Sequence, residues 1–227
     1  PYSIRMDFIM EFINYAHRGA SAYAPENTLA AFYMGWQMGA NGIETDVQRT
    51  KDGVLVLFHD NELMRIAGRP EAIHDLTYAE LLQIDFGLPT GERFKGERIP
   101  TLEEFLRHFG GKDLHFAIEI KEHGVEEETL RLIHQYCRQD HVIITTGIWD
   151  AITAVRALDP DMRVGYLCKY LSEPLMESAK QPGVFQRQSN GINRLNNSVM
   201  KVHADAVAFF QNGEPAPLHV QADILDG

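Results

Sequence analysis

The stretch GIETDVQRTKDGVLVLFHD, residues 42–60, decides the fold expected for this chain. It contains two apolar runs on either side of a Lys-Asp-Gly turn, which is the pattern of a β-hairpin. Side chains two residues apart lie on the same face of a strand, so Glu44 and Asp46 share a face. A core face does not hold two carboxylates, and the returning strand ends in His59-Asp60. The stretch therefore predicts a polar site next to a turn.

The position of His59 depends on the length of the hairpin loop. Too few residues separate Asp46 from Val54 for a helical crossover, so the two strands must be antiparallel. A two-residue Asp-Gly loop would place His59 opposite Asp46, and a four-residue loop would place it opposite Glu44. Both registers keep His59 on the carboxylate face, whereas a three-residue loop would turn it away.

Around this hairpin, apolar strand-like runs alternate with helix-like segments. Strands are predicted over residues 12–16, 113–121, 141–146 and 163–168, and helices over residues 26–42, 76–85, 100–111, 126–139 and 149–160. Asn27 or Thr28 is expected to cap the first helix, and Thr101 caps the third. This alternation is typical of a parallel sheet with helical crossovers, either an open doubly wound sheet or a closed barrel.

Polar residues cluster where the predicted strands end. The first strand is followed by His17-Arg18, and the strand over residues 113–121 carries Glu119 and Lys121 two apart on one face. Active sites of parallel α/β folds lie at the carboxyl ends of their strands, so these ends should meet. The expected site contains His17, Arg18, Glu44, Asp46, His59, Glu119 and Lys121.

The residue types at this site indicate metal-assisted phosphoryl chemistry. Three neighbouring carboxylates repel one another unless a cation binds or their pKa values rise. Ligands that are all oxygens suit Mg²⁺ or Ca²⁺ better than Zn²⁺. Two histidines beside such an ion suit one general acid and one general base. Arg18 and Lys121 would hold an anion, and the fork of the arginine fits a phosphate.

The composition narrows the class of protein further. The chain has 227 residues, a formal net charge of −11 and only two cysteines, Cys137 and Cys168. This charge argues against a nucleic-acid partner, and so few cysteines fit a reducing compartment. No apolar run approaches the roughly 20 residues that cross a bilayer, and residues 1–15 lack the apolar core of a signal peptide. We expect a cytoplasmic protein with one domain, residues 1–227.

Short motifs along the chain resemble the glycerophosphodiester phosphodiesterase family. They are HRG at 17–19, PENT at 25–28, ETD at 44–46, TKDG at 50–53, HD at 59–60 and EIK at 119–121. The resemblance covers residues 13–168, and it is the ordered combination that is specific. It implies an α/β fold, a TIM (β/α)₈ barrel with a small β-hairpin extension at its C-terminal mouth.

The resemblance also implies roles for the site residues. One divalent cation, Mg²⁺ or Ca²⁺, would bind Glu44, Asp46 and Glu119. His17 and His59 would be the acid/base pair, and Arg18 and Lys121 would hold the substrate phosphate. The reaction would be hydrolysis of a small-molecule glycerophosphodiester to sn-glycerol 3-phosphate and an alcohol, as part of lipid and glycerol metabolism. The attacking oxygen would come from water or from the neighbouring glycerol hydroxyl.

Two alternatives remain at this point. A related lipid phosphodiesterase, similar to a phospholipase or a sphingomyelinase D, should carry exposed apolar or basic loops, which this acidic chain does not show. A non-catalytic phosphate-binding barrel would be expected to lack one of the site residues, and all of them are present.

The C-terminal part departs from the family pattern. The strand pattern weakens beyond about residue 172, where SNGIN (189–193), DAVAFF (205–210) and ADILDG (222–227) are the predicted last three strands of the barrel. Thr146-Gly147 stand where the family commonly has a Ser-Phe pair. These departures concern substrate selection and barrel closure rather than the metal ligands.

Overall fold

The computed structural model describes residues 13–168, 184–186, 198–202, 210–211 and 214–215. Five strands pair in parallel in chain order: β1 (Tyr15–His17), β2 (Gly42–Arg49), β4 (His115–Ile120), β5 (Val142–Thr146) and β6 (Arg163–Cys168). Each strand is added beside the previous one and the order never reverses. This progression is that of a (β/α) barrel, whereas a doubly wound sheet reverses its strand order.

Helices connect these strands at the positions that the sequence predicts. The connecting helices are α1 (Leu29–Gln37), α4 (Leu102–Phe109), α5 (Glu126–Tyr136), which η4 (Gln139–His141) follows, and α6 (Trp149–Leu158). Thr28, rather than Asn27, is the N-cap of α1, and its hydroxyl accepts a hydrogen bond from the Ala31 amide. Thr101 caps α4 as predicted, because its hydroxyl accepts from the amide of Glu104. No helix in the described part of the chain is long and apolar enough to cross a membrane.

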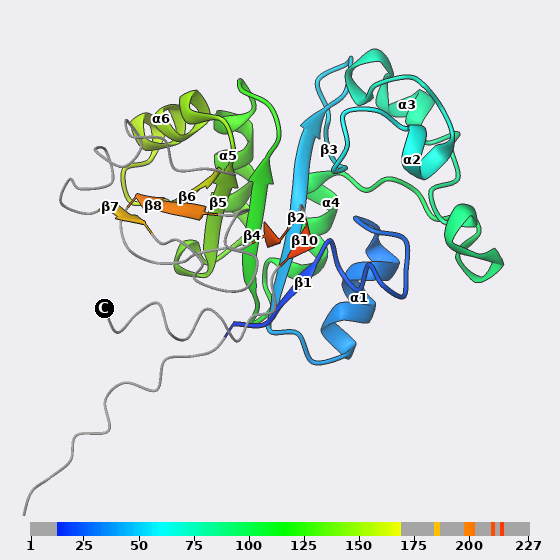
Figure 1. The fold of residues 1–227 in the computed structure, drawn as a ribbon, viewed down its shortest axis with the longest axis horizontal. Helices are drawn as coiled ribbons and strands as arrows, with labels where there is room; N and C mark the ends of the chain where they lie inside the picture. Colours follow the sequence, from blue (N-terminus) through cyan, green and yellow to red (C-terminus); the bar gives the residue numbers. More distant parts are fainter. Residues whose placement is uncertain (1–12, 169–183, 187–197, 203–209, 212–213, 216–227) are drawn as a thin grey trace, which may run out of the picture.

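The hairpin extends β2 beyond the sheet with the short strand β3 (Leu55–Leu57) (Figure 1). Val47 lies opposite Leu57, and the Thr50 amide donates to the carbonyl of Val54. The loop therefore has three residues, and its Gly53 has a φ of +88°. The two-residue and four-residue loops considered from the sequence are therefore wrong. A three-residue loop requires a residue in the left-handed conformation, and Gly53 supplies it.

The segment between β3 and α4 forms a separate layer over the end of β2 (Figure 1). It contains α2 (Met64–Ala67), α3 (Tyr78–Leu81) and the 3-10 helices η1 (Ile73–Asp75), η2 (Leu88–Thr90) and η3 (Glu92–Phe94). An apolar cluster of its own, which includes Leu63, Leu81 and Phe86, is buried beneath it. Because α2 lies just after His59, this layer holds the loops of the site in place.

The remaining described strands differ from the prediction. β8 (Ser198–Val202) pairs with β6 antiparallel, and β7 (Val184–Gln186) pairs with β8. A parallel strand was expected beside β6. The antiparallel pairing of β8 differs from this expectation, and antiparallel strands can pair without a helical crossover between them. The predicted strands 189–193 and 222–227 lie outside the described residues. Phe210, at the end of the predicted strand 205–210, belongs to β9 (Phe210–Gln211), which pairs antiparallel with β10 (Glu214–Pro215).

The main core lies between the parallel strands and the helices that connect them. Its centre is Phe105 of α4, whose ring centroid is 4.7 Å from that of Phe32 and 5.7 Å from that of Phe116. All three side chains are almost fully buried. This packing fixes α1 and α4 against the sheet and so determines where the loops at its carboxyl edge begin.

We predict that Phe105→Ala lowers the free energy of unfolding by about 3–5 kcal/mol, because the deletion leaves a cavity beside the rings of Phe32 and Phe116. Urea unfolding measures this change. Leu158→Ala, at a side chain that is half exposed, is the control and should cost less than about 0.5 kcal/mol. Equal losses in the two variants would contradict this account of the core.

Candidate active site

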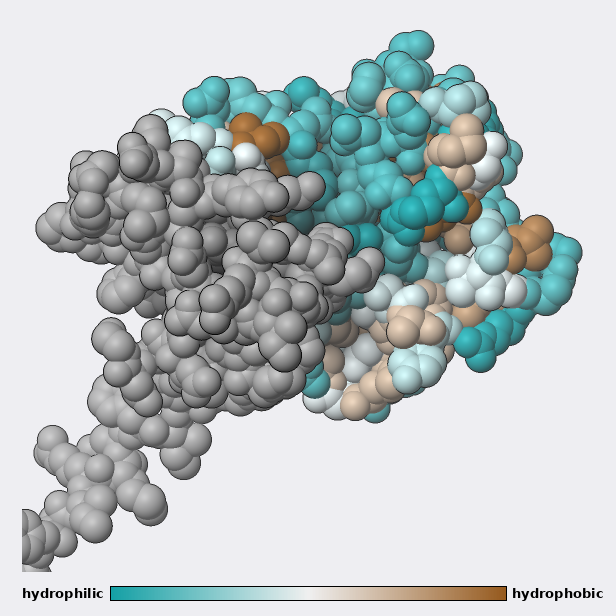
Figure 2. All heavy atoms as spheres, viewed as in Figure 1, coloured by the Kyte–Doolittle hydropathy of each residue, from teal (hydrophilic) through white to brown (hydrophobic). Residues whose placement is uncertain are grey.

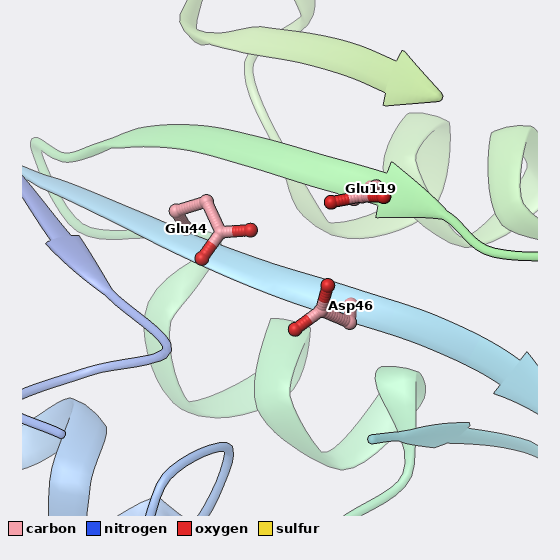
Figure 3. A group of neighbouring side chains, drawn as sticks. All are labelled: Glu44, Asp46 and Glu119. Carbon is pink, nitrogen blue, oxygen red and sulfur yellow. The ribbon is translucent and has the colours of Figure 1, made fainter. Parts of the chain in front are cut away.

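Three carboxylates meet on one face of the sheet. The parallel register makes Asp46 of β2 the partner of Glu119 of β4, and Glu44 lies two residues before Asp46 on the same face. Each of the three offers an oxygen, and these oxygens lie within 4.8 Å of one another. Figure 3 shows the side chains pointing toward a common centre. The structure therefore brings these three carboxylates together at one place on the sheet.

The cluster has the properties of an oxygen-ligated cation site. Within the described structure, Oε1 of Glu44 and Oδ1 of Asp46 are buried and have no hydrogen-bond partner. Burial, with the charge of Asp46, raises the pKa of Glu119 to about 6. Burial and then the charges of Asp46 and Glu119 raise the pKa of Glu44 well above its usual value. A divalent cation would relieve this repulsion and satisfy both oxygens.

Two basic side chains flank the carboxylates. Nε of Arg18 lies 3.5 Å from Oδ2 of Asp46. Nζ of Lys121 lies 2.9 Å from Oε1 of Glu119 and 3.5 Å from Oδ1 of Asp46. Burial opposes the charge on Lys121, but Glu119 and Asp46 together raise its pKa. Both bases therefore stay cationic next to the position where an anion would approach the cluster.

The end of β1 places His17 and Arg18 over the carboxylates. His17 is the register partner of Glu44, and its Nε2 lies 3.7 Å from Oε2 of that residue. Arg18 adopts a φ of +53°, and its amide donates to Oε2 of Glu44 over 3.0 Å. Burial, followed by the charge of Arg18, lowers the pKa of His17 to about 4. His17 is therefore uncharged at neutral pH and able to accept a proton.

His59 comes close to His17 although the hairpin register is the one that should turn it away. The amide of Phe58 donates to the carbonyl of Asp46, so Phe58 takes the position opposite this carboxylate. β3 has already ended at Leu57, so strand alternation no longer determines the direction of His59. The charge of His59 contributes to the lowered pKa of His17, and Nδ1 of His59 lies 2.7 Å from Oδ1 of Asp60.

Two further polar residues lie at the site, although neither was predicted from the sequence to belong to it. Asn27 adopts a φ of +55°, and its Nδ2 donates to Oδ2 of Asp46 over 2.9 Å. Its Oδ1 accepts from the hydroxyl of Thr45 over 2.8 Å. Asparagine is common at helix N-caps, so the sequence indicated a capping role for Asn27 and not a contact with Asp46.

Gln48 is the second residue that was missed. It is buried on the same face of β2 as Glu44 and Asp46, and its Nε2 donates to the carbonyls of Phe58 (2.8 Å) and Asp60 (2.7 Å). These two bonds hold the backbone on both sides of His59. A polar residue two positions after Asp46, on the site face, was the available signal in the sequence.

The parallel strand–helix order, with an acidic cluster and flanking bases at the carboxyl ends of the strands, defines an α/β protein of the barrel class. The chain matches the Glycerophosphoryl diester phosphodiesterase family over residues 17–210. It therefore belongs to this family, as the sequence resemblance predicted, and it is an enzyme of the phosphoric diester hydrolase class.

Individual relatives agree with this assignment. A glycerophosphodiester phosphodiesterase of Caldanaerobacter subterraneus is 40% identical over 163 residues, which cover 70% of this chain and 67% of the relative. The Bacillus subtilis protein YhdW is 35% identical over 93% of this chain and 91% of its own length. The structure of an Oleispira antarctica phosphodiesterase in complex with the product sn-glycerol-3-phosphate is similar with a TM-score of 0.67 and 32% identity. That match covers 73% of this chain and 70% of the neighbour, and it confirms the TIM-barrel fold class.

We predict that Glu119 makes the metal-free protein less stable as the pH rises. Its pKa in the folded state, about 6, exceeds its ordinary value of 4.5, so the folded state holds the proton more tightly. This stabilisation is complete below about pH 4.5 and is lost as the pH rises through about 6. Between pH 4 and 7, the free energy of unfolding of the wild type should fall by about 2 kcal/mol relative to Glu119→Gln.

Urea unfolding in EDTA measures this difference at several pH values. The comparison with the variant is needed because His17, whose pKa is lowered to about 4, adds stability as the pH rises from 4 to 6.5. A difference between wild type and Glu119→Gln that stays constant over this range would contradict the raised pKa.

We predict that Gln48→Leu loosens the loop that carries His59. The variant keeps the side-chain volume but removes two donors, so the free energy of unfolding should fall by about 1–3 kcal/mol. Amide hydrogen exchange at residues 58–60 should become faster. Gln135→Leu, on the exposed surface of α5, is the matched control and should change neither quantity. Unchanged exchange at residues 58–60 in Gln48→Leu would show that the glutamine does not hold this loop.

Proposed function

We propose that this chain hydrolyses glycerophosphodiesters to sn-glycerol 3-phosphate and an alcohol, with one divalent cation and with His17 and His59 as the acid/base pair. The observation that carries this proposal is the cluster of three carboxylates, two of them buried with an oxygen that lacks a hydrogen-bond partner, next to two cationic side chains. The product named for the Oleispira antarctica neighbour, sn-glycerol-3-phosphate, supports the substrate class.

The cation would bind to Glu44, Asp46 and Glu119. When bound, Mg²⁺ or Ca²⁺ would act as a Lewis acid toward a phosphoryl oxygen and neutralise developing charge. When ionised, the three carboxylates carry three negative charges, and Arg18 and Lys121 balance two of them. A divalent ion therefore leaves a site with one net positive charge, which matches the single negative charge of a phosphodiester.

Arg18 and Lys121 would bind the phosphate from two sides of the site. The two residues come from the ends of β1 and β4, on opposite sides of β2. Each already lies within 3.5 Å of Asp46, so both can reach an anion placed over the carboxylates. The guanidinium group offers a planar fork for two phosphate oxygens, whereas the ammonium group acts as a compact charge.

The two histidines would move the protons. One accepts the proton of the attacking oxygen, which belongs to water or to the neighbouring glycerol hydroxyl, and the other donates a proton to the leaving alkoxide. Asp60 fixes the ring of His59 through Nδ1, which leaves Nε2 for the substrate. Burial would raise the pKa of Asp60, but hydrogen bonds with Arg65 and His59 lower it, so Asp60 remains ionised.

A membrane-active lipid phosphodiesterase is less well supported. Such an enzyme needs a continuous apolar or basic surface near its site. In Figure 2 the described part of the visible face is mostly hydrophilic, with apolar residues in small separate groups. We therefore favour a water-soluble glycerophosphodiester as substrate and, given only two cysteines, a cytoplasmic setting.

The test is release of glycerol 3-phosphate from glycerophosphocholine and glycerophosphoethanolamine. Protein stripped with EDTA should be inactive and should recover on addition of Mg²⁺ or Ca²⁺. Glu44→Gln should not recover, because it removes a ligand. His17→Ala and His59→Ala should each lower kcat by about 10²–10⁴-fold, which is the usual contribution of one acid/base group.

His134→Ala is the matched control for the histidine variants. His134 pairs with Asp159 over 2.8 Å, much as His59 pairs with Asp60, but it lies on the surface of α5. This variant should keep full activity. Folded wild-type protein that releases no glycerol 3-phosphate with either ion would refute the proposed function.

A further inference from the structure

A partly exposed arginine connects two loops of the site. Arg65 of α2 donates from Nε to Oδ2 of Asp60 over 2.6 Å. Its two terminal nitrogens donate to Glu26, over 2.8 Å to Oε2 and 2.6 Å to Oε1. Asp60 follows β3, whereas Glu26 lies between β1 and α1, so one guanidinium group joins segments that are far apart in the sequence.

Each carboxylate that Arg65 holds contacts a different residue of the proposed machinery. Asp60 lies 2.7 Å from Nδ1 of His59 through its other oxygen. Glu26 accepts a hydrogen bond of 3.2 Å from Arg18. His59, Asp60, Arg65, Glu26 and Arg18 therefore form one continuous chain of contacts, with Arg65 in the middle.

The electrostatics of this chain depend on Arg65. Burial alone would raise the pKa of Glu26, but hydrogen bonds from Arg65 and the charge of Arg18 lower it, so this carboxylate is ionised. The side chain of Glu26 is only 16% exposed, so its charge is poorly solvated and depends on its cationic partners. Without Arg65, Arg18 would be the one cationic partner left to Glu26 among the described residues, and Glu26 would draw it away from Asp46.

We propose that Arg65 is a positioning residue that directs His59 and Arg18 toward the same substrate phosphate. The inference rests on the proposed function, in which these two residues act on one phosphodiester. Three directional bonds from a rigid, planar group fix the relative orientation of Asp60 and Glu26, which a flexible ammonium group would not do. The contacts found for Arg65 in the described part of the chain are with Asp60 and Glu26, not with a proposed metal ligand.

Substitution of Arg65 should impair catalysis and phosphate binding together. In Arg65→Gln, kcat should fall by about 10–100-fold, because small displacements of an acid/base group have effects of this size. KM should rise as well, because Arg18 is no longer held. Arg65→Lys keeps the charge without the fork and should recover only part of the loss. Added guanidinium chloride, below denaturing concentration, should partly restore kcat in Arg65→Gly.

Arg69→Gln is the matched control. Arg69 also forms two hydrogen bonds with a carboxylate, Glu71, and its side chain is 42% exposed against 48% for Arg65. Its pair has no contact with His59 or Arg18 among those found in the described residues. Arg69→Gln should therefore keep wild-type kcat and KM.

The possible outcomes separate the two hypotheses. An inactive wild type overturns the proposed function and this inference with it. An active wild type, with Arg65→Gln no different from Arg69→Gln, overturns only the role of Arg65. Full recovery in Arg65→Lys, or no rescue of Arg65→Gly by guanidinium, also contradicts a role that depends on the geometry of the guanidinium group.

Discussion

The approach of three carboxylates, two of them buried, to within 4.8 Å between their oxygens is the constraint on which the rest of the site depends. The constraint arises from the backbone, because the parallel register makes Asp46 and Glu119 direct neighbours and strand alternation adds Glu44. Such an arrangement is electrostatically unfavourable by itself, as the raised pKa values of both glutamates show. Cationic and amide side chains around the cluster offset this cost by contacting the carboxylates.

Cations and amide donors surround the cluster at successive distances. Arg18, Lys121 and Asn27 contact the carboxylates directly, and all three lie close to the ends of parallel strands. Farther out, Gln48 and Arg65 hold the loops rather than the carboxylates. The site therefore depends on two parts of the fold. The strand ends hold the carboxylates, and the layer that contains α2 holds the loops. This layer has an apolar cluster that is separate from the main core.

In the hairpin, His59 approaches His17 although the register is the one that should turn it away from the carboxylates. The alternation of strand side chains requires an even-numbered loop to bring His59 to the carboxylates, yet the loop has three residues and ends at Gly53. His59 nevertheless approaches His17, because β3 ends at Leu57, Phe58 still bonds to the carbonyl of Asp46, and Gln48 holds the turn that follows. Strand periodicity applies only while the strand continues, and the sequence does not indicate where pairing ends.

The sequence by itself determined the parallel strand–helix order, the shared face of Glu44 and Asp46, and the strand ends that carry Arg18, Glu119 and Lys121. These features depend on local periodicity and on the rule that strand ends meet at one edge. Only the tertiary structure decided that β8 pairs antiparallel with β6 and that Asn27 binds Asp46. It also decided that Arg65 joins Glu26 to Asp60, a contact across 39 positions of sequence. Contacts of this kind depend on how separate loops turn and pack, and no local pattern encodes that.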